Sequence, residues 1–424
     1  MAEIKPFRAL RFSDKAGKIS SLTCPPYDII SEEERQALLQ KNPFNVIRLE
    51  LPREGEDPYA AAGQTLKSWI SDDILHRDTD PGLYLYEEEF SAYGQVKKIK
   101  GLICLVKLEE FSKGIILPHE ETLSKAKQDR FRLMNATGCN FSQIYSLYND
   151  EEHTTRARID ALSSGEPRYE FCDGAGVTHR MWLVNDPVAI RAVCDEFQDR
   201  KLYIADGHHR YETALNYRNS LREQGKATGG EDYVMMTLVD MENEGLVVFP
   251  THRMVRGLLE FSAEKLMEAC RSYFDVVPRS PLSEIPANLD ALYRQGKKAF
   301  ACYCGGGEWT LLTLRDESVM ERLLPEKSDA YRGLDVSVLH SLILERLLGI
   351  DRENMANQKN LVYTRSMEEA TASVQKGESQ CAFLLNPTRV QEIRDVAAAG
   401  EKMPQKSTYF YPKLITGLVM NQID

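Results

Sequence analysis

The chain has 424 residues, of which 42% are hydrophobic and 28% are charged, an ordinary composition for a globular protein of about two or three domains. It carries 53 Lys and Arg against 64 Asp and Glu, which gives a formal net charge of −11. Binding to DNA or RNA requires clustered positive charge. The excess of acidic residues therefore argues against a general nucleic-acid-binding protein, although a local basic patch stays open, and we expect no tight, specific DNA complex.

The N-terminus and the cysteines predict a cytoplasmic protein. Residues 1–18 are polar and charged, with no apolar run of signal-peptide length, and no run in the chain is long enough to span a bilayer. The nine cysteines include one CxC pair, Cys302 and Cys304, and no CxxC pair. This pattern favours free thiols in a reducing compartment over disulfides or a structural zinc site.

The first part of the chain mixes short strands and helices with turns marked by proline. Residues 24–28 (CPPYD) predict a rigid loop, because paired prolines cannot lie within a helix. Ser31 followed by Glu34 is a capping box that begins a helix. Further along, the patterns predict a strand at 46–51, a helix at 59–72, and two strands at 82–90 and 94–108 joined by a turn.

The middle and the end of the chain continue this irregular mixture. The predicted elements are a strand at 201–205, a long helix at 211–224, a strand pair at 233–239 and 246–249, a helix capped by Ser262, a hairpin at 299–303 and 308–314, an amphipathic helix at 336–348, and a strand at 381–385. No regular alternation of strand and helix is present. The sequence therefore predicts an α+β (mixed α/β) fold, with one region at 1–255 and an α+β region at 256–424.

The most informative segment is the junction at residues 202–211 (LYIADGHHRY), where a strand leads directly into a helix. The N-terminus of a helix favours anions, and Gly207 lets the backbone approach a ligand closely. Arg210 can form paired hydrogen bonds with phosphate oxygens, and His208 and His209 can donate hydrogen bonds or transfer a proton. Asp206 can bind Mg²⁺ or act as a base.

A purely structural interpretation of this junction stays open. Asp206 can cap the helix, Gly207 can form the turn, and Arg210 can pair with a carboxylate. Metal binding by His208 and His209 is disfavoured, because adjacent side chains point in different directions.

A second candidate segment is residues 118–122 (PHEET), which precede a charged helix. Glu120 or Glu121 can supply a general base or a metal ligand there, and Lys127 or Arg130 can contact phosphate. The alternative is a solvent-exposed helix face with surface ion pairs.

Three weaker candidates lie elsewhere in the chain. Arg253, in the segment 250–253 (PTHR), can contact phosphate. Residues 406–413 are aromatic and flanked by lysines, so they can stack on a base or form interdomain core. Cys24 as a nucleophile is disfavoured, because no histidine lies near it in the sequence.

The motif at Asp206 to Arg210 resembles the phosphate-binding motif of the ParB/sulfiredoxin superfamily. That superfamily includes CTP-binding partitioning proteins, sulfiredoxin and free-serine kinases, and the motif is most similar to the kinase version. The whole chain resembles a bacterial family, domain of unknown function 1015, whose members are often labelled SpoOJ-like or ParB-like. The segments that carry this resemblance are residues 24–28, 45–49, 119–122, 129–130, 205–211, 250–253 and 406–413.

The resemblance implies a nucleotide-binding core in residues 1–255 and a small phosphate ligand. The implied function is phosphotransfer or phosphate-ester hydrolysis on a small hydroxyl compound such as serine or O-phosphoserine, with ATP or ADP as the nucleotide and Mg²⁺ as the metal. The alternative is a nucleotide-binding regulator of the ParB type, and a DNA-binding segregation factor is disfavoured by the acidic charge and by the lack of a helix-turn-helix pattern.

The predicted roles are as follows: Asp206, Glu120 and His208 in catalysis; Gly207, His208, His209, Arg210, Arg130 and Arg253 in phosphate or nucleotide binding; and Asp206 and Glu121 in metal binding.

Overall fold

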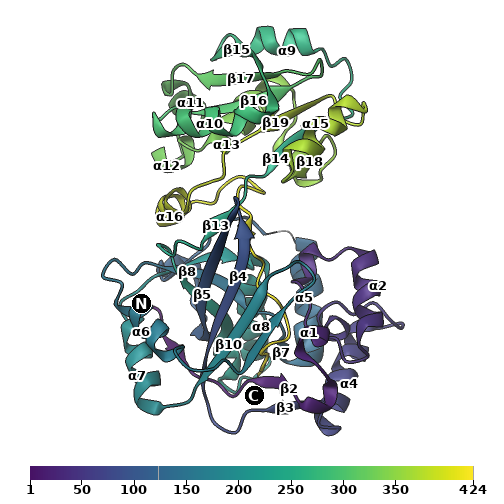
Figure 1. Ribbon diagram of the computed structural model, residues 1–424, viewed down its shortest axis with the longest axis vertical. Coiled ribbons are helices and arrows are strands. Elements are labelled where there is room, and N and C mark those ends of the chain that lie inside the picture. Colours follow the sequence, from purple (N-terminus) through teal and green to yellow (C-terminus); the bar gives the residue numbers. More distant parts are fainter. Residues whose placement is uncertain (123, 424) are drawn as a thin grey trace. The chain divides into compact units, whose positions relative to one another are not determined.

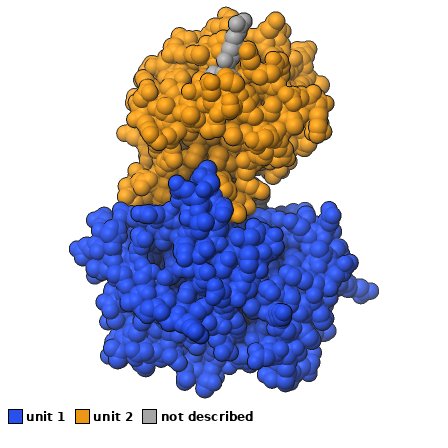
Figure 2. Space-filling view, viewed as in Figure 1, with its two compact units in different colours: residues 1–118, 122–247, 412–424 blue, residues 119–121, 248–411 orange. Residues whose placement is uncertain are grey.

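The computed structural model describes residues 1–122 and 124–423, and these form two compact units. Unit 1 comprises residues 1–118, 122–247 and 412–424, and unit 2 comprises residues 119–121 and 248–411 (Figure 2). Neither unit is a continuous stretch of the sequence, and the last residues of the chain belong to unit 1. The sequence predicts domains at 1–255 and 256–424, and this division stays a prediction.

Unit 1 is built on a nine-stranded mixed sheet (Figure 1). Its order is β6-β11-β8-β12-β5-β4-β10-β9, with β1 also pairing with β5. The pairs β6–β11 and β8–β12 are parallel, whereas the other pairs are antiparallel. The strands are β1 (Ile4–Lys5), β4 (Leu83–Ala92), β5 (Gln95–Lys107), β6 (Ile116–Leu117), β8 (Ile144–Tyr148), β9 (Tyr169–Cys172), β10 (Thr178–Val184), β11 (Leu202–Asp206) and β12 (Tyr233–Asp240).

The helices of unit 1 pack in two core clusters, one of which includes the apolar side chains of this sheet. The helices are α1 (Ile19–Leu22), α2 (Glu32–Lys41), α3 (Ile47–Glu50), α4 (Pro58–Ser71), α5 (Ser124–Thr137), α6 (Thr154–Leu162), α7 (Pro187–Glu196) and α8 (His208–Glu223). One core cluster joins Leu83, Leu85 and Leu102 of the sheet to side chains of α6, α7 and α8. A second cluster holds α3 and α4 together with the short strands β2 (Leu10–Phe12) and β3 (Leu75–Arg77).

The strand predicted at residues 46–51 is wrong, because this segment contains the helical turn α3. Asn45 explains the difference. Its side-chain oxygen accepts a hydrogen bond from the Ile47 N–H at 3.0 Å, and its side-chain nitrogen donates to the carbonyls of Ser21 and Thr23. Such side-chain bonds to the backbone begin a turn and override the β-propensity of valine and isoleucine.

Two further predictions need correction. Residues 233–239 do form a strand, β12, but its two edges are occupied by β5 and β8 and not by residues 246–249. Residues 336–348 are not one regular α-helix, since α13 (Asp335–Val338) is followed by a π-helical stretch at Leu339–Leu347. Neither the partner of a strand nor the local pitch of a helix is encoded by apolar periodicity alone.

Unit 2 contains a six-stranded antiparallel sheet of order β15-β17-β16-β19-β14-β18 (Figure 1). Its strands are β14 (His252–Val255), β15 (Phe274–Ser280), β16 (Ala299–Tyr303), β17 (Trp309–Leu314), β18 (Leu361–Thr364) and β19 (Cys381–Leu384). Its helices include α9 (Ala263–Cys270), α10 (Ile285–Arg294), α11 (Ser318–Leu323), α12 (Asp329–Arg332), α14 (Arg352–Ala356), α15 (Met367–Gln375) and α16 (Val390–Ala398). Apolar side chains of α10 and α15 pack on β16 and β19.

Several local predictions are confirmed. The capping box of Ser31 and Glu34 forms in both directions, and Ser262 caps α9 through the Lys265 N–H. The antiparallel pairs β4–β5 and β16–β17 form around their predicted turns. The mixed α/β class is confirmed as well. No helix in residues 1–122 or 124–423 is long and apolar enough to cross a membrane.

Candidate functional site

The junction between β11 and α8 has the backbone geometry that the sequence predicts. Gly207 occupies the N-cap position with φ of 96°, and as a glycine it offers no side chain to cap the helix. A β-carbon at Gly207 would lie 2.9 Å from two nitrogens of the Arg210 guanidinium. Glycine is therefore required both for the left-handed backbone and for the close approach of Arg210 to the start of the helix.

Asp206 does not cap α8 but binds two cations. Its Oδ2 accepts a hydrogen bond from Arg210 at 2.8 Å, and its Oδ1 accepts one from Lys413. Burial raises the pKa of the Asp206 carboxyl, but Lys413 and Arg210 outweigh it and hold that pKa well below its usual range. The group therefore carries one negative charge against two positive charges at neutral pH, which leaves a net positive charge at the helix N-terminus.

The C-terminal segment brings Lys413 to this junction from 207 residues away. Gln143 connects Arg210 with the C-terminal segment. Its backbone carbonyl accepts a hydrogen bond from Arg210 at 2.5 Å, and its side chain donates to the Ile415 carbonyl at 3.1 Å. The segment is anchored further by β21 (Asn421–Gln422), which pairs with β7 (Cys139–Asn140). The sequence offered no signal for this pairing beyond the presence of lysines around an aromatic segment.

The first turns of α8 bring further charged groups to the same region. His208 is buried and His209 is half-buried. Two residues after Arg210, the Glu212 carboxylate accepts hydrogen bonds from Lys127 at 2.7 Å and from the Thr122 hydroxyl at 2.6 Å. Lys127 therefore does reach α8 from α5, but it contacts a carboxylate there.

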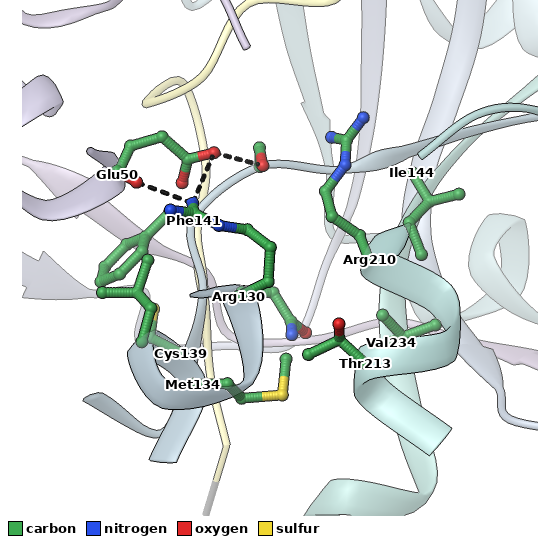
Figure 3. Close-up of a pocket in the computed structure, with 12 residues that line it drawn as sticks. Glu50, Arg130, Met134, Cys139, Phe141, Ile144, Arg210, Thr213 and Val234 are labelled. Carbon is green, nitrogen blue, oxygen red and sulfur yellow. Dashed lines mark hydrogen bonds and ion pairs between the residues drawn. The ribbon is translucent and has the colours of Figure 1, made fainter. Parts of the chain in front are cut away.

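A second group of charges, Glu50 and Arg130, lines a pocket together with Arg210 (Figure 3). Arg130 donates to the Glu50 backbone carbonyl at 2.7 Å, lies 3.8 Å from the Glu50 carboxylate, and stacks 4.1 Å above the Tyr27 ring. Ser142 donates to the same carboxylate at 2.9 Å. Burial raises the pKa of Glu50, although Arg130 and Arg210 act in the opposite direction. Glu50 was missed from the sequence because its apolar neighbours suggested a strand.

Arg130 and Arg210 also line a small cavity of about 40 Å³, shown in Figure 3. Two buried polar atoms of its lining residues, Arg210 Nε and Thr213 Oγ1, have no hydrogen-bond partner among the described residues. A cavity of this size admits only one or a few atoms the size of a water oxygen. It can receive a small polar group but not a nucleoside.

A buried polar network lies farther along the unit 1 sheet. Glu88 on β4 faces His179 on β10, and the Tyr86 hydroxyl lies 2.9 Å from Glu88 Oε1 and 2.7 Å from His179 Nδ1. His179 Nε2 lies 3.1 Å from Asp173 Oδ2. Burial raises the pKa of Glu88 to about 8. Its second oxygen has no hydrogen-bond partner within the described part of the chain.

Tyr145 on β8 connects this network electrostatically with the helix junction. It lies opposite Asp206 in the β8–β11 pair. Burial raises the pKa of its hydroxyl well above the usual value, and the Glu88 and Asp206 carboxylates raise it further. The strand pattern of residues 82–90 predicted neither Glu88 nor His179 as part of a polar network, because their contact depends on the register between β4 and β10.

Three predicted site residues belong to unit 2. Glu120 and Glu121 lie in its segment 119–121, and their predicted roles beside Asp206, in catalysis for Glu120 and in metal binding for Glu121, stay predictions. Arg253 is fully buried. Its guanidinium donates to His340 Nε2 at 3.2 Å and to the carbonyls of Thr251, Gln405 and Lys406. These contacts give Arg253 a structural role inside unit 2.

The residues described here offer little to a metal ion. Both oxygens of Asp206 are engaged by Arg210 and Lys413, and the described residues contain no group of three or more His, Cys, Asp or Glu that could hold a metal. Mg²⁺ prefers several oxygen ligands, including carboxylates that are not already paired. We therefore assign no chemical step to a metal, and the predicted metal role of Asp206 and Glu121 stays a prediction.

Comparison with known proteins identifies a family match. The model of the family described as "Protein of unknown function (DUF1015)" matches residues 4–337, which confirms the family resemblance drawn from the sequence. No curated protein matches the chain. The comparisons give no support for a ParB or SpoOJ label.

Solved structures match only distantly. A conserved hypothetical protein from Pyrococcus furiosus is 15% identical, with a TM-score of 0.34, over 73% of this chain and 90% of that chain. A variant of a free serine kinase in complex with AMP is 12% identical, with a TM-score of 0.39, over 76% of this chain and 92% of that chain. Another variant of that kinase, in complex with ADP, is 13% identical, with the same TM-score and coverage. At these TM-scores, function has to be inferred from the chain's own residues.

Proposed function

The chain belongs to this DUF1015 family of unknown function, and we propose that it binds the phosphate of a nucleotide or a small phosphate ester at residues 207–210. The observation that carries the proposal is the sharing of one carboxylate, Asp206, by two cations, Arg210 and Lys413, at a helix start whose N-cap residue is a glycine. Such a start attracts anions through its N–H groups and its dipole. The net positive charge adds to this attraction.

The proposed reaction is phosphotransfer to, or phosphate-ester hydrolysis from, a small hydroxyl compound such as serine or O-phosphoserine. Phosphoryl transfer depends mainly on positioning and on cations that stabilise the charge of the transferring group. Arg210 and Lys413 supply those cations in the proposal, and His208 and His209 supply further hydrogen-bond donors.

Asp206 has a specific part in this proposal. A general base works best when its pKa lies near the operating pH, whereas the two cations hold the pKa of Asp206 well below its usual range. We therefore assign Asp206 to positioning Arg210 and Lys413 and not to taking a proton. The proton acceptor for a hydroxyl substrate is then another group, for which Glu120 remains the proposal from the sequence.

Isothermal titration calorimetry tests the binding step with ATP, ADP, CTP and O-phosphoserine. Loss of a charge-assisted hydrogen bond costs about 1.5–3 kcal/mol, so Arg210→Ala should weaken binding roughly 10- to 100-fold. Arg222→Ala is the matched control, because Arg222 lies in the last turn of the same helix and pairs with Asp232. Equal affinities in the wild type and in Arg210→Ala would contradict the proposed site.

Turnover is tested separately by ³¹P NMR of the full chain with ATP and serine, and with O-phosphoserine alone. Formation of ADP and O-phosphoserine, or release of inorganic phosphate, supports an enzyme. Binding of nucleotide without either reaction would instead support a nucleotide-binding regulator.

A further inference from the structure

Unit 2 contains a cluster of thiols that the proposed function does not use. Cys302 lies on β16, Cys304 follows directly after it, and Cys381 begins β19. The antiparallel register pairs Cys302 with Phe383 and Tyr303 with Ala382. The next pair along the same ladder is therefore Cys304 and Cys381.

The strand geometry places all three thiols on one face of the sheet. Side chains alternate between the two faces along a strand, so residues 302 and 304 point to one face, and residue 381 shares the face of residue 383, which lies opposite residue 302. The Sγ atoms of Cys302 and Cys304 are 3.7 Å apart. Cys381 is also in hydrogen-bonding contact with both of them.

The three thiols differ in access to solvent. Cys302 and Cys381 are buried, whereas Cys304 is half-buried. Cys304 lies where the strand ends and the turn Gly305-Gly306-Gly307 begins, and a β-carbon at any of these glycines would meet no other atom within 4 Å. A small oxidant can therefore approach Cys304 along a turn that carries no side chains.

The contacts also favour a reactive thiol at this position. The hydrogen bond from Cys302, followed by that from Cys381, lowers the pKa of the Cys304 thiol, while burial acts in the opposite direction. Burial raises the pKa of Cys302 well above its usual value. Because the thiolate is the nucleophile in thiol chemistry, the most accessible thiol of the cluster is also the one most readily ionised.

We propose that Cys304 is a site of reversible oxidation by hydrogen peroxide, and that it closes a disulfide with Cys381 across β16 and β19. The cross-strand pair is favoured over the Cys302–Cys304 pair by geometry. Residues directly opposite in an antiparallel ladder have Cα atoms about 4.5–5.5 Å apart, within the range that a disulfide requires. Residues two apart on one strand are separated by about 6.5 Å, near the upper limit of that range.

The chemistry proceeds in two steps. The Cys304 thiolate attacks one oxygen of the peroxide, the O–O bond breaks, and the departing hydroxide takes a proton from solvent to form water, which leaves a sulfenic acid. The Cys381 sulfur then attacks the Cys304 sulfur, the S–O bond breaks, and the departing hydroxide takes the Cys381 proton as water. Two thiols lose two electrons in total, and one peroxide is reduced to two waters.

Mass spectrometry of the full chain tests this inference. The reduced protein is exposed to hydrogen peroxide, its remaining thiols are blocked with N-ethylmaleimide, and peptides are mapped without reductant. We expect a mass loss of about 2 Da from one disulfide, a peptide that links Cys304 to Cys381, and reversal by dithiothreitol. Cys304→Ser should remove this linked peptide, whereas Cys172→Ser should keep it, because Cys172 is exposed but lies outside the cluster.

A second variant keeps the test decisive if Cys304→Ser fails to fold. In Cys381→Ala the sulfenic acid has lost its resolving thiol, so dimedone should label Cys304 after peroxide treatment. The proposal is overturned by a disulfide between Cys302 and Cys304, by the absence of any disulfide in the oxidised wild type, or by dimedone labelling of Cys172 in place of Cys304.

Discussion

Asp206 and Glu88 are two carboxylates of the same sheet unit with opposite electrostatic behaviour. Asp206 meets two cations, Arg210 and Lys413, and its pKa falls although burial acts to raise it. Glu88 is fully buried with a tyrosine hydroxyl as its hydrogen-bond donor, and its pKa rises to about 8. Burial disfavours the charged form of both carboxyls, so the presence of paired cations decides whether the pKa falls or rises.

This difference separates the chemical roles that the two groups can have. Asp206 stays ionised at neutral pH and holds its cations in place. Glu88 exchanges its proton near neutral pH, which is the range a proton acceptor or donor requires. Tyr145, whose pKa responds to both carboxylates, connects the two regions. Substitutions that remove the components of either region test this contrast.

The largest effect is expected from Asp206→Asn. This substitution leaves Arg210 and Lys413 facing each other without their shared anion, and breaking a buried ion pair costs about 3–5 kcal/mol. We expect the free energy of unfolding at pH 7 to fall by roughly 3 kcal/mol, measured by urea denaturation. The double variant Asp206→Asn/Lys413→Met should recover part of that loss, because it also removes one of the two repelling cations. A double variant less stable than Asp206→Asn would contradict this account of the cluster.

The pH dependence of stability is the next test. Burial raises the pKa of Glu88 in the folded chain to about 8, above the ordinary glutamate value of 4.5. The folded state therefore holds a proton between these values that the unfolded state releases, and stability is full below about pH 4.5 and is lost as the pH rises through 8. Ionisation of Glu88 should lower the free energy of unfolding of the wild type by on the order of 3 kcal/mol between pH 5 and pH 8, and Glu88→Gln should remove this decrease.

The comparison variant for this measurement is Glu33→Gln, which alters an exposed glutamate on α2. Urea midpoints at pH 5, 6.5 and 8 should show the wild-type slope in Glu33→Gln and a flatter slope in Glu88→Gln. Parallel slopes in all three proteins would mean that Glu88 is ionised in the folded chain. The contribution of Asp206 has the opposite sign, since it is present above the ordinary aspartate pKa and is lost only as the pH falls toward the lowered value.

A smaller effect is expected from Gly207→Ala. An alanine at φ of 96° is strained, and its β-carbon would displace the Arg210 guanidinium. Such strain costs about 1–3 kcal/mol, and phosphate affinity should fall together with stability. Gly225→Ala provides the control, because Gly225 also has a positive φ but has open space around it. Equal losses of phosphate affinity in both variants would show that phosphate binding does not depend on the close approach of Arg210 to Gly207.

These residues also show how far the sequence alone could predict the structure. Asp206, Gly207 and Arg210 are close in sequence, so a local pattern was enough to place them at one helix start. Lys413 is 207 residues from Asp206, and no local pattern predicts a contact over that separation. Glu88 and His179 meet only because β4 and β10 pair in one particular register, and register depends on the whole sheet.

The same distinction holds for the fold. Turns and caps, such as the capping box of Ser31 and the hairpin between β16 and β17, were predictable because the chemistry that forms them is local. The helical turn α3 was not predictable in this way, because Asn45 donates hydrogen bonds to the carbonyls of Ser21 and Thr23, which lie 24 and 22 residues away in the sequence. Strand order and the assignment of the C-terminal segment to unit 1 likewise depend on contacts that sequence periodicity does not encode.

The smallest expected effect concerns Tyr86, whose hydroxyl lies between Glu88 and His179. Tyr86→Phe removes the hydrogen bond that favours the ionised form of Glu88, so the pKa of Glu88 should rise further. A single hydrogen bond contributes about 1 kcal/mol, and the loss of stability should be greater at pH 8, where the ionised carboxylate needs the donor, than at pH 5. Tyr93→Phe serves as the control, because Tyr93 is exposed in the turn between β4 and β5. If the loss is the same at both pH values, the Tyr86 hydroxyl contributes by packing and hydrogen bonding alone, and the raised pKa of Glu88 comes from burial without any control by its neighbour.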